Sequence, residues 1–90
     1  MQVVLTPRAK KELDFWAKSG NKGILKKIVL LIDDIQLHPY SGIGKPEQLK
    51  YDLANRWSRR IDKEHRLVYR MTDENNIEIL NILSLKGHYE

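Results

Sequence analysis

The spacing of the apolar residues changes near residue 39, and this change constrains the fold more than any other feature. Before it, apolar residues recur every three or four positions, as they do on one face of an amphipathic helix. After it, they alternate with polar residues, which is typical of half-buried strands. Pro39, Gly42, Gly44 and Pro46 lie between the two regions and predict a loop.

Local signals mark both ends of a first predicted helix. Thr6 is a favourable N-cap, and Pro7 fits the first helical turn, where its missing N–H is not needed. Gly20 can end the helix because glycine adopts a left-handed backbone without a steric penalty. Phe15 lies off the apolar stripe, so we expect it to pack at the helix edge or to contact a partner. The predicted core positions are Ala9, Leu13, Trp16 and Ala17.

A second helix is predicted directly after the first. Asn21 can cap its start, and Pro39 ends it because proline cannot continue a helix. The short joint at Gly20 and Asn21 makes the two helices a hairpin. The predicted core stripe is Ile24, Ile28, Leu31 and Ile35, widened by Leu25, Val29 and Ile32.

The remaining segments are predicted to form a sheet. Strands are expected at residues 2–5, 49–53, 57–61, 65–71 and 77–83. Residues 77–83 are largely apolar on both faces, which predicts the central strand. A chain of 90 residues forms a single domain, residues 1–90. We therefore expect an α+β fold, with an N-terminal strand and a helical hairpin packed on one face of a mainly antiparallel four- to five-stranded sheet.

Composition excludes several classes of protein. Without cysteine, disulfides and thiolate chemistry are absent, and a reducing cytoplasm is the expected location. No apolar run is long enough to span a membrane, and residues 1–4 do not resemble a secretory leader. His38, His65 and His88 lack the spacing of metal ligands, so no metal or other cofactor is predicted.

Positive charge is concentrated between residues 50 and 70. The net charge of this segment equals that of the whole chain, +4. A solvated sheet face would explain an ordinary charge run, but arginine predominates here, and its planar fork suits phosphate. Because the helices should cover one sheet face, we expect the arginines on the other face or at its rim. The basic residues are Lys50, Arg56, Arg59, Arg60, Lys63, Arg66 and Arg70.

A basic sheet face with aromatic neighbours suits RNA, although the pattern equally fits a protein-binding surface. For an enzyme, no glycine-rich phosphate loop, nucleophilic cysteine or metal site is visible, which leaves acid–base chemistry. Glu47, the histidines and the arginines would suit RNA cleavage by its own 2′-hydroxyl group. Taken singly, Glu47 is expected to be a surface acid, Arg66 a salt-bridge partner and His88 a tail residue.

Four motifs together resemble one family. GKPEQLK (44–50), WSRRI (57–61), EHRLVY (64–69) and HY (88–89) match the YoeB/Txe toxins of the RelE superfamily in order and spacing. These toxins are the mRNA-cleaving members of bacterial type II toxin–antitoxin pairs. The motifs span about half the chain, and the predicted helical hairpin is compatible with the RelE/YoeB fold.

The resemblance implies a metal-independent endoribonuclease, an mRNA interferase, that enters the ribosomal A site and cuts mRNA there. By motif, Glu47 would be the general base and His88 the general acid. Arg66 would stabilise the transition-state phosphate, and Tyr89 would orient the substrate or His88. The family also implies a YefM/Phd-like antitoxin as partner, and often a homodimer. The residues implied to bind RNA phosphates are Lys50, Arg59, Arg60 and Lys86.

The C-terminal tail departs from the family pattern. Members often have Arg-Tyr-His-Tyr where this chain has Lys86-Gly87-His88-Tyr89. Lysine keeps the charge without the bidentate fork, and Gly87 removes an aromatic ring beside the implied acid. Two alternatives remain open. A non-catalytic relative, such as the gyrase-inhibiting ParE toxins, should lack the Glu/Arg/His set, and a ribosome- or RNA-binding module would need neither Glu47 nor His88.

Overall fold

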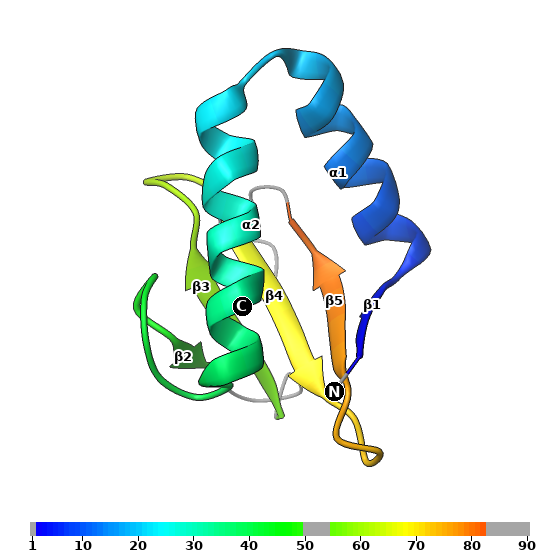
Figure 1. Ribbon diagram of the computed structural model, residues 1–90, viewed down its shortest axis with the longest axis vertical. Coiled ribbons are helices and arrows are strands. Elements are labelled where there is room, and N and C mark those ends of the chain that lie inside the picture. Colours follow the sequence, from blue (N-terminus) through cyan, green and yellow to red (C-terminus); the bar gives the residue numbers. More distant parts are fainter. Residues whose placement is uncertain (1, 50–54, 83–90) are drawn as a thin grey trace.

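The computed structural model describes residues 2–49 and 55–82 and confirms the α+β fold, with two helices on one side of a five-stranded sheet (Figure 1). Neither of the two described helices has the length and apolar character needed to cross a membrane. In chain order the elements are β1 (Val3–Leu5), α1 (Pro7–Ser19), α2 (Lys22–Leu37), β2 (Glu47–Gln48), β3 (Arg56–Arg60), β4 (Arg66–Met71) and β5 (Ile77–Asn81).

The local signals for the helix ends are confirmed. The backbone N–H of Ala9 donates to the hydroxyl oxygen of Thr6 at 3.1 Å, and Gly20 closes α1 with φ of 78°. The side-chain oxygen of Asn21 accepts from the N–H of Ile24 at 3.1 Å at the start of α2. A capping bond of this kind typically contributes about 1 kcal/mol.

The sheet is mixed, because β1 pairs with β5 in parallel while the other neighbours are antiparallel. The strand order is β1-β5-β4-β3-β2. The prediction of 77–83 as the central strand is therefore wrong in detail, since β5 is an interior strand and β4 occupies the middle. β5 is still rich in apolar residues, because Ile77 and Ile79 pack in the main core beneath α1 while Leu80 packs in a small cluster on the opposite face.

Strand β2 begins earlier than the sequence predicts. Glu47 and Gln48 pair with β3, whereas the predicted strand was 49–53. The N–H of Leu49 still donates to the carbonyl of Arg56 at 2.8 Å, so the chain continues along β3 at least to that point. Residues 50–53 of the prediction lie outside the described residues.

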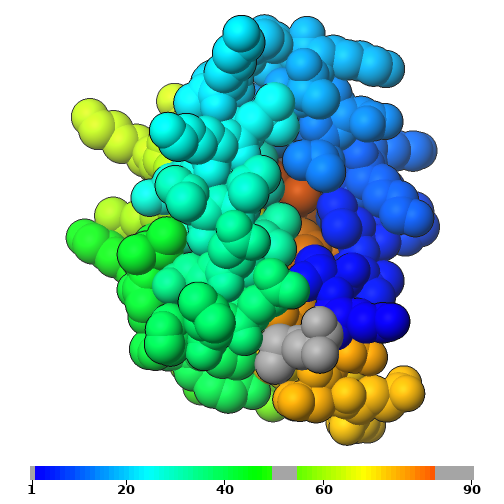
Figure 2. Space-filling view, in the orientation of Figure 1, coloured from blue at the N-terminus to red at the C-terminus, as the bar shows by residue number. Residues whose placement is uncertain are grey.

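The main core lies between the helices and one face of the sheet. Figure 2, which views the molecule from the helix side, shows α1 and α2 over the sheet, with part of β5 visible between them. The opposite face, here called the distal face, carries a small separate apolar cluster of Leu49, Val68 and Leu80. The buried residues of the main core are Ala9, Trp16, Ile24, Ile28, Leu31, Ile35, Ile61, Leu67, Tyr69, Ile77, Ile79 and Ile82.

The core stripes are narrower than predicted. Val29 is 56% exposed and Ala17 is also exposed, so both predictions of core positions are wrong. A helix lying on a sheet buries a stripe only about 100° wide, and these residues fall outside that stripe. Phe15 is exposed as well, with its ring edge-on to Trp16 at 5.3 Å between centroids.

Helix α1 also fixes the end of β5. The N–H of Ile82 donates to a carboxylate oxygen of Glu12 at 2.7 Å, and the indole N–H of Trp16 donates to the carbonyl of Ile82 at 3.3 Å. Glu12 is buried and also accepts from Arg8 at 3.1 Å. Both backbone groups of Ile82 are therefore satisfied by α1, directly before the C-terminal segment.

Candidate functional site

Glu47 and Arg66 lie near each other on the distal face. Glu47 is opposite Ser58, and Ser58 is opposite Val68. Directly opposed residues of antiparallel strands point to the same face, and Arg66 shares that face because it is two positions from Val68. Nη1 of the half-buried Arg66 donates to the hydroxyl of Ser58 at 3.4 Å. Ser58 is therefore a common neighbour of Glu47, which is exposed, and of the half-buried Arg66.

Arg60 completes this arrangement on the distal face. It lies directly opposite Arg66 in the β3–β4 pair and is exposed. Like charges directly opposite each other destabilise a sheet. An anion bound between the two guanidinium groups would relieve that repulsion, and a phosphate has the matching geometry. The pair is thus suited to bind a phosphate beside the carboxylate of Glu47.

Arg59 does not bind phosphate, and this part of the sequence-based prediction is wrong. Its side chain is fully buried on the helix side of the sheet. Nη1 donates to Oδ2 of Asp34 at 2.5 Å and to the carbonyl of Ile43 at 3.0 Å. Nη2 donates to the carbonyls of His38 at 2.5 Å and Ser41 at 2.8 Å. Its donors are occupied within the protein, and no surface of it remains for a ligand.

The buried Arg59 instead holds the loop that leads to Glu47. The hydroxyl of Tyr69 donates to the carbonyl of Pro39 at 2.5 Å and accepts from Nε of Arg59 at 3.3 Å. Asp34 accepts a further bond from the N–H of Ile43 at 3.0 Å. We call the contacts of Arg59 with Asp34, Tyr69 and the loop carbonyls the arginine clamp. Because the clamp fixes residues 38–43, it sets the start of the segment that enters β2.

Glycine is required where the loop crosses Asp34. Gly42 has φ of 110°, and a Cβ atom there would lie 2.0 Å from Oδ2 of Asp34. Any side chain at this position would therefore collide with the carboxylate that the clamp binds.

The clamp changes the ionisation of two of its members. The hydrogen bond from Arg59 is the largest cause that lowers the pKa of Asp34, and partial burial opposes it. Burial is the largest cause that raises the pKa of Tyr69, which the nearby guanidinium partly offsets. Asp34 therefore stays a carboxylate and Tyr69 stays a neutral phenol at physiological pH, as the observed hydrogen bonds require.

Four predicted site residues, Lys50, Lys86, His88 and Tyr89, lie outside the described residues. Of the others, the structure brings Glu47, Arg60 and Arg66 together and separates Arg59 from them. Among residues 2–49 and 55–82, no three His, Asp or Glu side chains gather as metal ligands would.

Ser58 and Asp34 are not among the residues predicted from the sequence. Ser58 had a usable signal, because it alternates with Arg60 and so had to share a face with it. Asp34 had none, since it is 25 residues from Arg59 and looks like an ordinary polar residue of an amphipathic helix.

Comparison with known proteins places these features in a family. The sequence model for the YoeB-like toxin of bacterial type II toxin–antitoxin systems matches residues 5–89. The chain is 44% identical to Toxin YoeB of Streptomyces coelicolor over 89 residues, which cover 99% of this chain and all of that protein.

Solved structures of YoeB toxins have the same fold as this chain. A YoeB/ParE toxin from Agrobacterium tumefaciens has a TM-score of 0.87 at 36% identity, over 93% of this chain and 98% of that one. The toxin in the YoeB–YefM complex from Staphylococcus aureus has a TM-score of 0.82 at 38% identity, over 92% and 94%, and YoeB from that species has also been solved as a dimer. The chain therefore belongs to the YoeB-like toxins of bacterial type II toxin–antitoxin systems.

Proposed function

We propose that this toxin is an endoribonuclease that cleaves mRNA on the ribosome in the cytoplasm. The observation that carries the proposal is the opposed pair Arg60 and Arg66 on the distal face, with Glu47 beside it across Ser58. This arrangement offers a phosphate site next to a carboxylate. Such a pairing suits a reaction that moves a proton from a hydroxyl group and builds charge on a phosphorus atom.

In the proposed reaction, the 2′-hydroxyl oxygen attacks the adjacent phosphorus. Glu47 accepts the hydroxyl proton or orients the hydroxyl, and His88 donates a proton to the leaving 5′-oxygen. The bond from the 2′-oxygen to phosphorus forms while the bond from phosphorus to the 5′-oxygen breaks. The products are a 2′,3′-cyclic phosphate and a 5′-hydroxyl. Histidine suits the acid role because its reference pKa of about 6.5 lies near neutrality.

Arg66 is proposed to stabilise the negative charge that grows on the phosphate oxygens. A guanidinium has five N–H donors, and the bond to Ser58 uses one of them. Ser58 is fully buried, and we propose that it positions Arg66 while the remaining donors bind the substrate. Arg60, together with Lys50 and Lys86, would bind neighbouring phosphates, and Tyr89 would orient the substrate or His88.

A YefM-like antitoxin is the proposed protein partner. A related toxin from Staphylococcus aureus has been solved with YefM and also as a dimer. The net charge of +4 and the exposed arginine on the distal face favour an acidic segment as the inhibitor. We propose that such a segment covers the distal face, and that the free toxin forms a homodimer.

Replacement of the three proposed catalytic residues tests the mechanism. Glu47→Gln, Arg66→Ala and His88→Gln should each lower the cleavage rate about 10²- to 10⁴-fold, because each removes a proton-transfer group or a transition-state charge. The measurement is single-turnover cleavage of ribosome-bound mRNA, with chemical identification of the product ends.

The control is Glu78→Gln, which removes a carboxylate of β5 that pairs with Arg70, outside the proposed site. Full activity of His88→Gln would end the general-acid assignment, and a 5′-phosphate product would exclude attack by the 2′-hydroxyl. A wild-type protein that binds ribosomes without cutting mRNA would instead be an RNA-binding module or a ParE-like non-catalytic toxin.

A further inference from the structure

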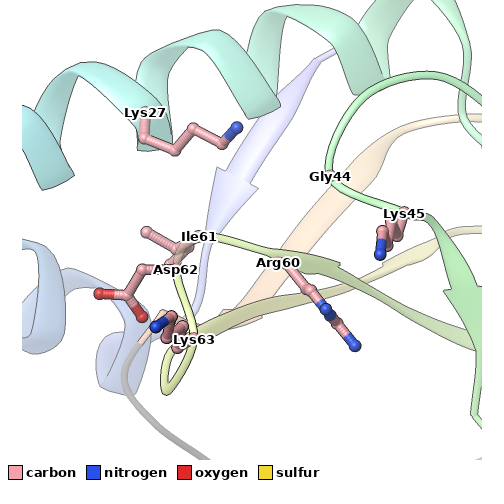
Figure 3. Close-up of a pocket in the computed structure, with 7 residues that line it drawn as sticks. All are labelled: Lys27, Gly44, Lys45, Arg60, Ile61, Asp62 and Lys63. Carbon is pink, nitrogen blue, oxygen red and sulfur yellow. The ribbon is translucent and has the colours of Figure 1, made fainter.

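A second basic site lies beside the proposed cleavage site. A cavity of about 350 Å³ opens between α2, the loop before β2 and the turn after β3. Figure 3 shows Lys27 reaching from α2 toward Gly44 and Lys45, with Arg60, Asp62 and Lys63 along the other side. We call this cavity the lysine pocket. Its lining residues are Lys27, Gly44, Lys45, Arg60, Ile61, Asp62 and Lys63.

The charge of the lysine pocket is strongly positive, since four of its seven lining residues are cations and only Asp62 is an acid. That carboxylate is already engaged, because its Oδ1 accepts from the N–H groups of Glu64 at 2.8 Å and His65 at 2.7 Å. The four cations gather from three separate segments of the chain without an acidic partner for each. An anionic ligand would neutralise them.

A backbone hydrogen bond and close packing position Gly44 in the wall of the lysine pocket. The carbonyl of Gly44 accepts from the N–H of Arg60 at 2.7 Å, and a Cβ atom on Gly44 would lie 2.7 Å from Cδ2 of Leu31. The next residue, Lys45, has φ of 50°, a left-handed conformation that costs free energy in a residue other than glycine. The fold therefore holds a lysine in an unfavourable backbone geometry at the edge of this cavity.

We propose that the lysine pocket binds a phosphate of the RNA backbone, one that flanks the scissile phosphate or belongs to ribosomal RNA. This inference rests on the proposed function in taking RNA as the ligand. The cavity adjoins the site, because Lys45 is two residues before Glu47 and Arg60 lies opposite Arg66. Its four cationic side chains suit sequence-independent phosphate contacts.

Removal of two lysines tests the proposal. Lys27→Gln/Lys63→Gln leaves Glu47, Arg60 and Arg66 unchanged. Its matched control is Lys10→Gln/Lys18→Gln, which removes the same charge from exposed positions of α1 outside the pocket. The probes are empty ribosomes and a single-stranded 2′-O-methyl RNA, which lacks the attacking hydroxyl. Affinity is measured across a series of salt concentrations.

The pocket variant should bind roughly tenfold more weakly at physiological salt, and the slope of log K against log salt should become shallower by about one to two. The control variant should keep the affinity and the salt slope of the unmodified protein. A shallower slope on the 2′-O-methyl RNA identifies mRNA as the source of the phosphate, and a change confined to ribosomes identifies ribosomal RNA. Slopes equal to those of the control on both probes would overturn the proposal.

Two further outcomes are distinguishable. Loss of binding to a polyglutamate peptide, with both RNA slopes unchanged, would overturn the proposal in favour of an acidic protein ligand. Cleavage by the unmodified protein is scored separately. If the unmodified protein does not cleave mRNA, but the slope of log K against log salt still becomes shallower in the pocket variant, the proposed function is wrong and the phosphate-binding role of the lysine pocket is supported.

Discussion

At the scale of single residues, adjacent arginines have opposite roles. Arg59 and Arg60 are neighbours in β3, yet one is fully buried and the other exposed. Arg59 satisfies Asp34 and three loop carbonyls from within the core. A buried charge is tolerated only when it is paired and hydrogen-bonded, and the arginine clamp meets both conditions. The charge of Arg60 remains available to a ligand.

Exchanging each arginine for lysine should expose this difference. Arg59→Lys keeps the charge but loses the planar fork, so we expect a loss of about 2 kcal/mol or more in the free energy of unfolding. Arg60→Lys, the matched control on the exposed side of the same strand, should change it by less than about 0.5 kcal/mol. Equilibrium urea unfolding measures both. Equal stabilities of the two variants would show that the clamp does not stabilise the fold.

At the scale of elements, α1 fixes the end of β5 as well as covering the core. Glu12 and Trp16 satisfy the backbone of Ile82. The helix therefore anchors Ile82, the residue directly after β5.

Substitution of Glu12 tests this anchoring. Glu12→Ala leaves the buried N–H of Ile82 without an acceptor and should cost about 1–3 kcal/mol. Glu12→Gln should cost less, because the amide oxygen can still accept that bond. Hydrogen exchange of the Ile82 amide is the direct measurement. If exchange were equally slow in Glu12→Ala and in the unmodified protein, the carboxylate would not be the anchor.

At the scale of the whole molecule, the two faces of the sheet have different roles, since one packs in the stabilising core and the other carries the proposed site. The helix side holds the main core and the arginine clamp, while the distal face carries Glu47, Arg60 and Arg66. The clamp joins the two, since it sits in the core and holds the loop that enters β2. Folding and the geometry of the proposed site are therefore coupled.

The lowered pKa of Asp34 makes the free energy of unfolding depend on pH. The pKa of Asp34 is lowered in the folded state, so its contribution is fully present above the unfolded value, 3.8, and is lost as the pH falls through the lower folded value. The stability gap between the unmodified protein and Asp34→Asn should therefore narrow below about pH 4. Asp33→Asn, at an exposed position of α2, is the control. Urea unfolding from pH 7 to 3 measures both gaps, and a constant gap for Asp34→Asn would contradict the linkage.

The sequence by itself determined the helices, the fold class and the family. The caps at Thr6 and Asn21 depend on hydrogen bonds to residues three positions away, so local sequence is enough to predict them. Alternation within β3 also separates Arg59 from Ser58 and Arg60, although the motif resemblance had grouped Arg59 with Arg60 as phosphate-binding residues. Motif resemblance supplied the proposed roles of Glu47 and Arg66, which the structure then brought together.

Only the tertiary structure decided what each face contacts. Alternation separates Arg59 from Arg60, but it does not say that α2 and the following loop close over Arg59. That depends on Asp34, 25 residues away, and on carbonyls whose directions arise from the loop backbone. The lysine pocket likewise joins Lys27, Lys45 and Lys63 from three segments that no local pattern connects. Burial and charge clustering arise from contacts between distant segments, and a side chain's partners across such distances are set by packing rather than by its neighbours in sequence.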